Sequence, residues 1–363
     1  MKKVIFALAA VVALAACSQE DVIIADKGAA IGFDTFVEKA TRSVNDPSLT
    51  SSTLQDFAVF GYVEGAVLFD GTKVAKTIEN DDLESDWKYA GTQYWIAGAQ
   101  YNFNAVAPMT NGGWTKTAAT AESTTLSFTN NGTTDLLYAT AAQEGKASGN
   151  TVVSFNFRHV LSKVKFSFEN AYNASNATIR VENVKINNAY ASGSVVLNDE
   201  TVWTPVTTGD MLVLDFGKAT DNAATTTDKE AVDVAFEYGK TYESHNELLM
   251  IPGQSASDYT ITNADNTTTT KYENVYKVTF DVVLLVSGQV IDTYNHTIYT
   301  TFAPEAGKSY NLKAVINPEN IDPEHQQEPI EFTVLPFTDW TNGNTVDSTT
   351  NDEETVKDYY PLN

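Results

Sequence analysis

Apolar and polar residues alternate with a period of two along most of the chain, which is typical of β-strands with one buried face. The clearest case lies in 275–286, where one face carries Tyr276, Val278, Phe280, Val282, Leu284 and Val286. Residues 287–289 are typical of a turn, and 290–302 resumes the alternation, so we expect a long hairpin. No long stretch shows the 3.6-residue apolar repeat of an amphipathic helix. We therefore expect an all-β protein.

The stretch VVSFNFRHVLSKVKFSFE, residues 152–169, changes parity in its middle. Apolar residues hold odd positions up to Phe157 and even positions from Val164. Such a switch moves the apolar set to the other face of a strand. We therefore expect Arg158 to Lys163 to form a sheet corner or a short crossing, and we expect a structural role for His159 within it.

A short phrase recurs along the chain. GAQYNFNAV at 98–106 and GKSYNLKAV at 307–315 share Gly-x-x-Tyr-Asn-x-x-Ala-Val, and GKTY at 239–242 repeats the beginning. The phrase is either a common turn-to-strand idiom or a sign of two related β-domains in tandem. Many short strands split by polar loops, such as 221–228 and 263–270, favour two β-sandwich domains. We expect their boundary within 170–190.

The N-terminus is typical of an exported protein. Lys2 and Lys3 precede an apolar run over 4–16 that is too short to span a bilayer, which indicates a secretory signal. The run ends in Leu-Ala-Ala-Cys17, which resembles the lipobox of bacterial lipoproteins and implies cleavage before Cys17 and acylation of its thiol. The alternative is an ordinary signal followed by an incidental cysteine. The acidic residues after Cys17 are similar to the tether that sends Bacteroidetes lipoproteins to the outer face of the outer membrane.

Chain length and net charge limit the number of domains and the kinds of partner. Of the 363 residues, 347 remain after removal of the 16-residue signal, and this length favours about two domains. The formal net charge is −24, and removal of the two signal lysines makes it −26. Such a surface repels nucleic acid, so we expect no nucleic-acid partner.

Catalytic and metal-binding motifs are missing from the sequence. There is no H-E-x-x-H and no phosphate-binding loop, and GQSAS at 253–257 lacks the second glycine of a nucleophile elbow. The four histidines are far apart, and the acidic stretch 79–86 lacks the spacing of a calcium loop. No carboxylate pair is singled out for glycoside hydrolysis. We expect no enzymatic activity, no cofactor and no metal.

Several aromatic residues crowd the first half of the chain: Trp87, Tyr94, Trp95, Tyr101 and Trp114. If exposed, they could stack on sugar rings. We expect them instead to fill the first core and its edges.

Phrases spread over about 31–340 resemble the fimbrillin-like proteins of Bacteroidetes, which are type V pilus subunits. The phrases are IGFDTFVEKATRS, FAVFGYV, YWIAGAQYNFNAVAP, DLLYAT, FNFRHVLSKVKFSF, APEAGKSYNLKAVI and IEFTVLPFTDW. The resemblance implies a lipoprotein with two tandem transthyretin-like β-sandwich domains of the Ig-like Greek-key type. It also implies that an Arg-specific protease removes the lipidated segment with its first strand, and that a C-terminal strand of another subunit fills the gap.

Carried over to this chain, the resemblance makes Arg42 the cleavage residue and Ser43 the new N-terminus. Residues 40–47 show no strand pattern, as a protease substrate requires, whereas the other two arginines lie beside or within strand-like runs. The departing strand would carry Ile31, Phe33 and Phe36. The expected divisions are a signal peptide (1–16), a lipidated pro-segment (17–42), two domains (43–175 and 176–340) and an acidic tail (341–363).

The acidic C-terminal tail is the candidate donor strand. Its candidate donor residues are Val356, Tyr359, Tyr360 and Leu362. Asp358 interrupts their apolar face, and Pro361 has no N–H for a sheet ladder. A disordered acidic tail is the alternative.

We therefore expect a stalk or tip subunit of a cell-surface pilus. Its partners would be other pilus subunits, an Arg-specific surface protease and the outer membrane, reached through lipid on Cys17. It would reside in the outer membrane and, after processing, in the fimbrium. The alternatives are the pilus anchor, a monomeric surface lipoprotein that binds glycan or a host ligand, and an uncharacterised hydrolase.

Overall fold

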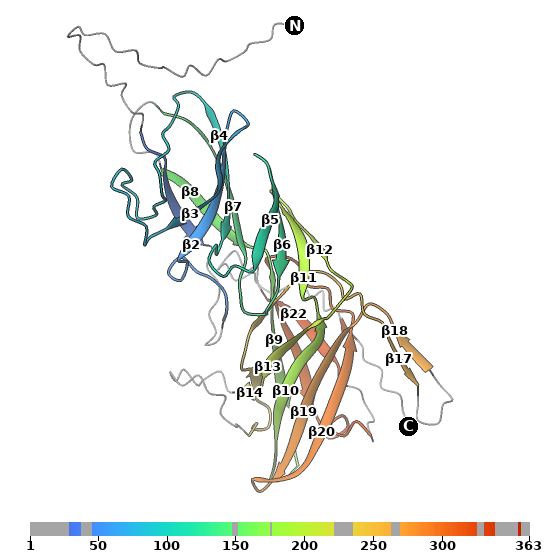
Figure 1. Ribbon diagram of the computed structural model, residues 1–363. Helices are drawn as coiled ribbons and strands as arrows, with labels where there is room; N and C mark the ends of the chain where they lie inside the picture. The colour runs from blue at the N-terminus through green and yellow to red at the C-terminus, as the bar shows by residue number, and fades with distance from the viewer. Residues whose placement is uncertain are drawn as a thin grey trace, which may run out of the picture.

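The computed structural model describes residues 29–37, 46–146, 152–174, 176–220, 235–262, 269–324, 330–337 and 355–356. Within these ranges the chain forms strands, turns and loops and no helix, so the expected all-β class is confirmed. It follows that this part of the chain contains no helix able to cross a membrane. The molecule is elongated, with two lobes along its length (Figure 1).

The first lobe contains two sheets. A six-stranded sheet has the order β1-β8-β7-β4-β2-β3. Its strands are β1 (Gly32–Val37), β2 (Asp56–Val63), β3 (Ala66–Ala75), β4 (Gln100–Ala107), β7 (Leu137–Glu144) and β8 (Val152–His159). A four-stranded sheet, β12-β11-β6-β5, consists of β5 (Trp114–Ala119), β6 (Thr124–Thr129), β11 (Ser192–Leu197) and β12 (Thr201–Pro205). Strand β2 is buried on both faces because Phe57 and Val59 enter one core while Ala58 and Phe60 enter another.

The second lobe packs two further sheets around one core. One sheet, β13-β10-β19-β20, consists of β10 (Ala177–Ala189), β13 (Leu212–Gly217), β19 (Tyr276–Val286) and β20 (Gln289–Thr300). The other has the order β14-β15-β9-β21-β22-β23, with β16 beside β9. Its strands are β9 (Ser162–Asn170), β14 (Ala219–Thr220), β15 (Thr241–Ser244), β16 (Leu248–Met250), β21 (Ser309–Ile316), β22 (Phe332–Phe337) and β23 (Thr355–Val356). A separate hairpin of β17 (Tyr259–Thr262) and β18 (Thr269–Tyr272) lies to one side (Figure 1). The expected hairpin over 275–302 is confirmed by β19 and β20.

The sheets do not divide at residue 175. Strand β9 precedes this position but pairs with β15, β16 and β21 in the second lobe. Strands β11 and β12 follow it, yet β11 pairs with β6 in the first lobe. The two lobes therefore share their middle segment, and the domain limits 43–175 and 176–340 remain a prediction.

The expected crossing between Arg158 and Lys163 is confirmed. Strand β8 ends at His159 and β9 begins at Ser162 in a different sheet, which explains the change of parity. His159 is buried there, and its Nδ1 lies 2.8 Å from Asp135 Oδ2. This contact gives the histidine the structural role that we expected.

The repeated Gly-x-x-Tyr phrase forms the same local structure each time. The glycine has a φ between 69° and 79°, a region that glycine enters without strain. The tyrosine hydroxyl then accepts a hydrogen bond from the backbone N–H five residues earlier. These bonds are Ile96 N to Tyr101 Oη (2.8 Å), Glu237 N to Tyr242 Oη (2.8 Å) and Glu305 N to Tyr310 Oη (3.0 Å). The phrases at 239–242 and 307–315 lead into β15 and β21, which belong to the same sheet of the second lobe. The phrase is therefore a common turn-to-strand structure and does not mark one copy per domain.

Candidate functional site at the first strand

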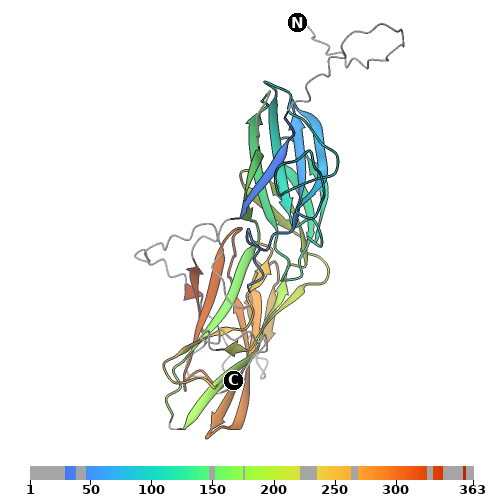
Figure 2. The same ribbon diagram turned by 90° about the vertical axis from the view of Figure 1, so that its left-hand side faces the viewer.

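Strand β1 lies at one edge of the six-stranded sheet, on the side of the first lobe that faces the viewer in Figure 2. One side of it runs parallel to β8, with Gly32 opposite Val152 and Val37 opposite Phe157. The other side and the residues just before it contact the irregular segment 87–95. Ile31 N donates to Gln93 O (2.8 Å), and Tyr89 Oη donates to Ile31 O (2.9 Å). Within β1 itself, Phe33 forms an isolated antiparallel bridge with Trp87, so the start of the strand is paired on both sides.

Phe33 of β1 occupies the centre of the aromatic core of the first lobe. Its side chain is fully buried. Its ring centroid lies between 5.5 and 6.5 Å from those of five other rings: Phe57, Phe69, Tyr89, Phe103 and Phe155. Phe69 belongs to β3, the opposite edge of the same sheet, so the sheet curves until its two edges share one core. Strand β1 thus closes this curved sheet.

The apolar residues of this strand differ in part from those expected. Ile31 and Phe33 are fully buried, as expected for a strand that fills a groove. Phe36, however, is 51% exposed, and Val37 takes the inward position at 2% exposure. Side chains alternate along a strand, so the odd positions that follow Phe33 face the core. Burial of Ile31, Phe33 and Val37 stabilises the lobe by roughly 5–9 kcal/mol relative to exposed side chains.

Both ends of the segment that follows β1 are attached to the folded part of the chain. Val37 N donates to Ser51 Oγ (2.9 Å), and Asp46 Oδ2 accepts from Lys163 Nζ (2.7 Å). Arg42 and Ser43 fall between these points and lie outside the described residues, as do Cys17 and the signal segment. Their expected roles remain predictions.

Within the C-terminal tail (341–363), the structure describes only the two residues of β23. There Val356 is paired with Phe332, and Thr355 with Thr333, so the backbone of this short strand lies against β22 of its own lobe. The other candidate donor residues, Tyr359, Tyr360 and Leu362, lie outside the described residues.

The crowded aromatic residues of the first half fill the core, as expected. Trp87, Trp95 and Tyr101 are between 1% and 4% exposed, and Tyr94 and Trp114 are half-buried. Trp87 packs against Phe57 of β2, and Trp95 packs against Tyr101 of β4. These side chains therefore do not form an open platform for sugar stacking.

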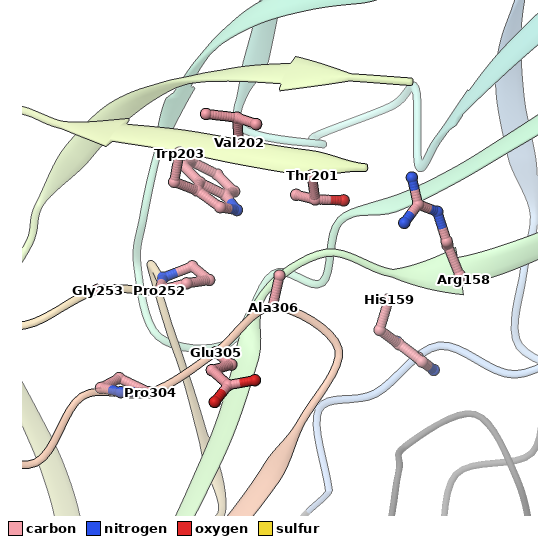
Figure 3. A pocket seen from close by; sticks show the side chains of 10 residues that line it. All are labelled: Arg158, His159, Thr201, Val202, Trp203, Pro252, Gly253, Pro304, Glu305 and Ala306. Atoms are coloured by element: carbon pink, nitrogen blue, oxygen red, sulfur yellow. The ribbon is translucent and has the colours of Figure 1, made fainter. Parts of the chain in front are cut away.

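A groove of about 520 Å³ lies where the two lobes meet (Figure 3). Its lining includes Arg158, Trp203 and Glu305. Trp203 Nε1 already donates to Val160 O (2.8 Å), and the Arg158 guanidinium already donates to Asn198 O. Across the part of the chain that the structure describes, no three His, Cys, Asp or Glu side chains are grouped so that they could hold a metal ion. We therefore take the position of β1 as the candidate functional site.

Sequence reasoning missed two parts of this site. It did not identify 87–95 as the cover of β1, because this segment has no strand pattern and contacts residues about 60 positions away. It also missed Val37, although the alternation that begins at Phe33 would have placed Val37 inside.

The comparisons with known proteins agree with the resemblance found in the sequence. A family model described as fimbrillin-like matches residues 41–340. No curated protein matches the chain. Similar solved structures include a candidate cell adhesion protein from Bacteroides uniformis (14% identity, 87% of this chain and 99% of the other covered, TM-score 0.42). Another comes from Bacteroides ovatus (13%, 87% and 99%, TM-score 0.44), and a third is the fimbrial anchor protein Mfa2 from Porphyromonas gingivalis (13%, 86% and 100%, TM-score 0.30).

At these identities and TM-scores the solved structures carry no functional argument. The family match is independent of them and spans well over half of the chain. The chain belongs to the fimbrillin-like family.

Proposed function

We propose that this protein is a structural subunit, stalk or tip, of a cell-surface pilus and that it polymerises by exchanging its first strand for a strand of another subunit. The observation that carries this proposal is the position of β1. The strand lies at a sheet edge, yet its Phe33 is the centre of the aromatic core. Its removal would expose an apolar groove and the unpaired edge of β8, which an incoming strand would cover by β-strand addition.

An Arg-specific surface protease would open the groove by cutting after Arg42. The family match begins at residue 41, so nearly all of it lies in the part of the chain that this cut would leave. Asp46 and its contact with Lys163 would hold the new end of the chain, which would begin at Ser43. An uncut subunit keeps its own strand in the groove and would not accept a donor.

The donor strand could bind better than the strand that it replaces. Strand β1 pairs with β8 in parallel, and parallel pairing is slightly less stable per residue than antiparallel pairing. A donor that runs in the opposite direction would therefore gain ladder stability. The candidate donor is the C-terminal tail with Val356, Tyr359, Tyr360 and Leu362, after release of β23 from β22.

The precursor would be held at the cell surface by lipid. Acylation of Cys17 would hold the precursor at the outer membrane until the cut releases it. The two lobes would be tandem transthyretin-like β-sandwiches with Greek-key connections. No enzymatic role is proposed. A pilus anchor would keep both its lipid and β1, and this outcome is distinguished by the experiment below.

The N-terminal residue of protein sheared from intact cells tests the proposal. We expect Ser43, together with multimers that resist SDS without heating. Acylated Cys17 on sheared, multimeric protein would contradict strand removal. Acylated Cys17 on protein that remains with the cells would replace the stalk or tip role with that of an anchor or a monomeric surface lipoprotein.

A further inference from the structure

A buried lysine contacts two buried carboxylates near the start of the proposed mature chain. Lys163 Nζ lies 2.7 Å from Asp46 Oδ2 and 3.2 Å from Glu247 Oε2. The three side chains are 2%, 5% and 8% exposed, respectively. They come from three separate segments, since Asp46 follows the first strand, Lys163 lies in β9 and Glu247 precedes β16.

The second carboxylate oxygen of Asp46 has donors of its own. Its Oδ1 accepts hydrogen bonds from the backbone N–H of Ser48 (2.8 Å) and from Ser48 Oγ. Donors placed in this way stabilise negative charge that develops on an oxygen during attack at the neighbouring carbon. The cluster therefore contains an amine, a carboxyl carbon, a proton acceptor and an oxyanion site.

We propose that Lys163 and Asp46 form an amide bond within the chain, so that this pair is a self-modifying cross-link site. The ammonium proton of Lys163 passes along the 2.7 Å hydrogen bond to Asp46 Oδ2, which leaves a neutral amine and a neutral acid. The nitrogen lone pair attacks Asp46 Cγ, and negative charge develops on Oδ1 beside the Ser48 donors. Glu247 takes a proton from the nitrogen and delivers it to Oδ2, which leaves as water. One amine and one acid give one amide and one water, with no oxidant, reductant or cofactor.

The surroundings favour this reaction over a lasting ion pair. Opposite charges in a site with little water carry a large desolvation penalty, and an amide removes the charges of Lys163 and Asp46. The Glu247 carboxylate that remains still has Lys165 Nζ 4.0 Å from its Oε1. The amide N–H would form beside Glu247, which can accept its hydrogen bond. A hollow of about 470 Å³ is lined by Asp46, Asn246 and Glu247 and gives the released water a route out.

The bond would join two positions that are 117 residues apart in the chain. It would fasten the segment just after Arg42 to the central strands of the second lobe. Because Asp46 follows the proposed cut, the bond would remain after removal of the first strand. It would form in the uncut chain as well, so the inference does not depend on strand exchange.

Peptide mass spectrometry of the purified, folded, uncut chain tests this inference. After complete digestion of the denatured chain, we expect a branched peptide that joins the segments around Asp46 and Lys163 and is lighter than their sum by one water. A succinimide at Asp70–Gly71 would lose the same mass, so only the branched peptide supports the bond. Two separate, unmodified peptides from a fully folded sample would overturn the proposal.

Variants separate the reaction from simple ion pairing. Lys163→Arg keeps the positive charge but should give no branched peptide, and Glu247→Gln should reduce its yield at least tenfold. Lys313→Met is the matched control, because Lys313 lies in β21 beside β9, is paired with Glu169 (2.7 Å), and its loss should leave the cross-link intact. Full cross-linking in Glu247→Gln would overturn the role assigned to Glu247. If Lys163→Arg fails to fold, the wild-type digest still decides the question.

Discussion

Strand β1 in the first lobe and strand β22 in the second are similar in packing but differ in how they are joined to the chain. Each carries a buried phenylalanine that enters an aromatic cluster. Phe33 contacts rings of the first lobe, and the Phe332 centroid lies 5.3 Å from Phe166 and 6.0 Å from Phe280. Each strand pairs with one long neighbour, β8 or β21. Their packing alone gives no reason to expect that one is removed and the other retained.

The connecting segments differ in chemistry. Residues 38–45, which follow β1, include Lys39 and Arg42. Residues 317–331, which precede β22, contain neither lysine nor arginine. A trypsin-like protease could therefore separate β1 from the chain but not β22. The comparison shows that a strand can be essential to its lobe and still be removable, because removal depends on whether the connecting segment contains a cleavage site.

The largest expected effect is a difference in stability between variants of the uncut chain and the same variants in assembled fibres. Phe33→Ala and Phe332→Ala should each lower the unfolding free energy of the uncut chain by about 3–5 kcal/mol, because each removes a buried ring. In assembled fibres Phe33 is absent under the proposal, so only Phe332→Ala should lower the melting temperature. Calorimetry on uncut chain and on fibres measures both.

Phe36→Ala is the matched control for Phe33→Ala. The Phe36 side chain is half exposed in the same strand, so its loss should change the unfolding free energy of the uncut chain by less than about 1 kcal/mol. A fibre that is destabilised by Phe33→Ala as strongly as the uncut chain would show that β1 stays in place.

Acid should weaken the second lobe through His296. Burial lowers the pKa of His296 from 6.5 to about 4, against a smaller opposing effect of its hydrogen bond to Ile321 O. The unfolded chain then binds more protons than the folded chain between these values, so stability is full above pH 6.5 and is lost as the pH falls toward 4. Between pH 7 and pH 5 the loss should be about 2 kcal/mol.

Denaturant unfolding at the two pH values, compared with His296→Phe, isolates this effect. The variant keeps a ring next to Phe280 but cannot titrate, so its pH dependence should be smaller by that amount. Equal pH dependence in both proteins would contradict the assignment.

A smaller effect concerns how tightly β1 is held. Tyr89→Phe removes the hydroxyl that donates to Ile31 O in the buried cover of the strand. We expect a loss of about 1 kcal/mol in the uncut chain, with faster hydrogen exchange along β1 and β8. The stability of fibres should fall less if the incoming strand accepts no hydrogen bond from Tyr89. Unchanged exchange in β1 would show that the cover does not hold the strand.

The strands were predictable where apolar and polar residues alternate, because successive side chains of a strand point to opposite faces of the sheet. The hairpin of β19 and β20, the crossing after His159 and the first strand around Phe33 follow from this pattern. The repeated Gly-x-x-Tyr phrase is visible in the sequence, but the hydrogen bond from the turn N–H to the tyrosine hydroxyl is visible only in the structure.

The candidate site was predictable only in part. Its strand was identified from apolar positions and from family resemblance, yet Phe36 was placed inside because hydrophobicity alone does not say which face of an edge strand is covered. Contacts such as Lys163 with Asp46, or Tyr89 with Ile31, join segments that are distant in sequence. The two lysines inside the apolar run after Leu161 were the one available signal, because a lysine in a buried strand requires a partner.

The central claim is that a cut after Arg42 opens the first lobe for a partner strand. Its most direct test is fibre formation on cells that produce Arg42→Ala, with Arg180→Lys as a control that changes an arginine within β10. We expect Arg42→Ala protein to remain uncut and monomeric at the membrane, while the control forms SDS-resistant fibres. Normal fibres from Arg42→Ala would contradict the account.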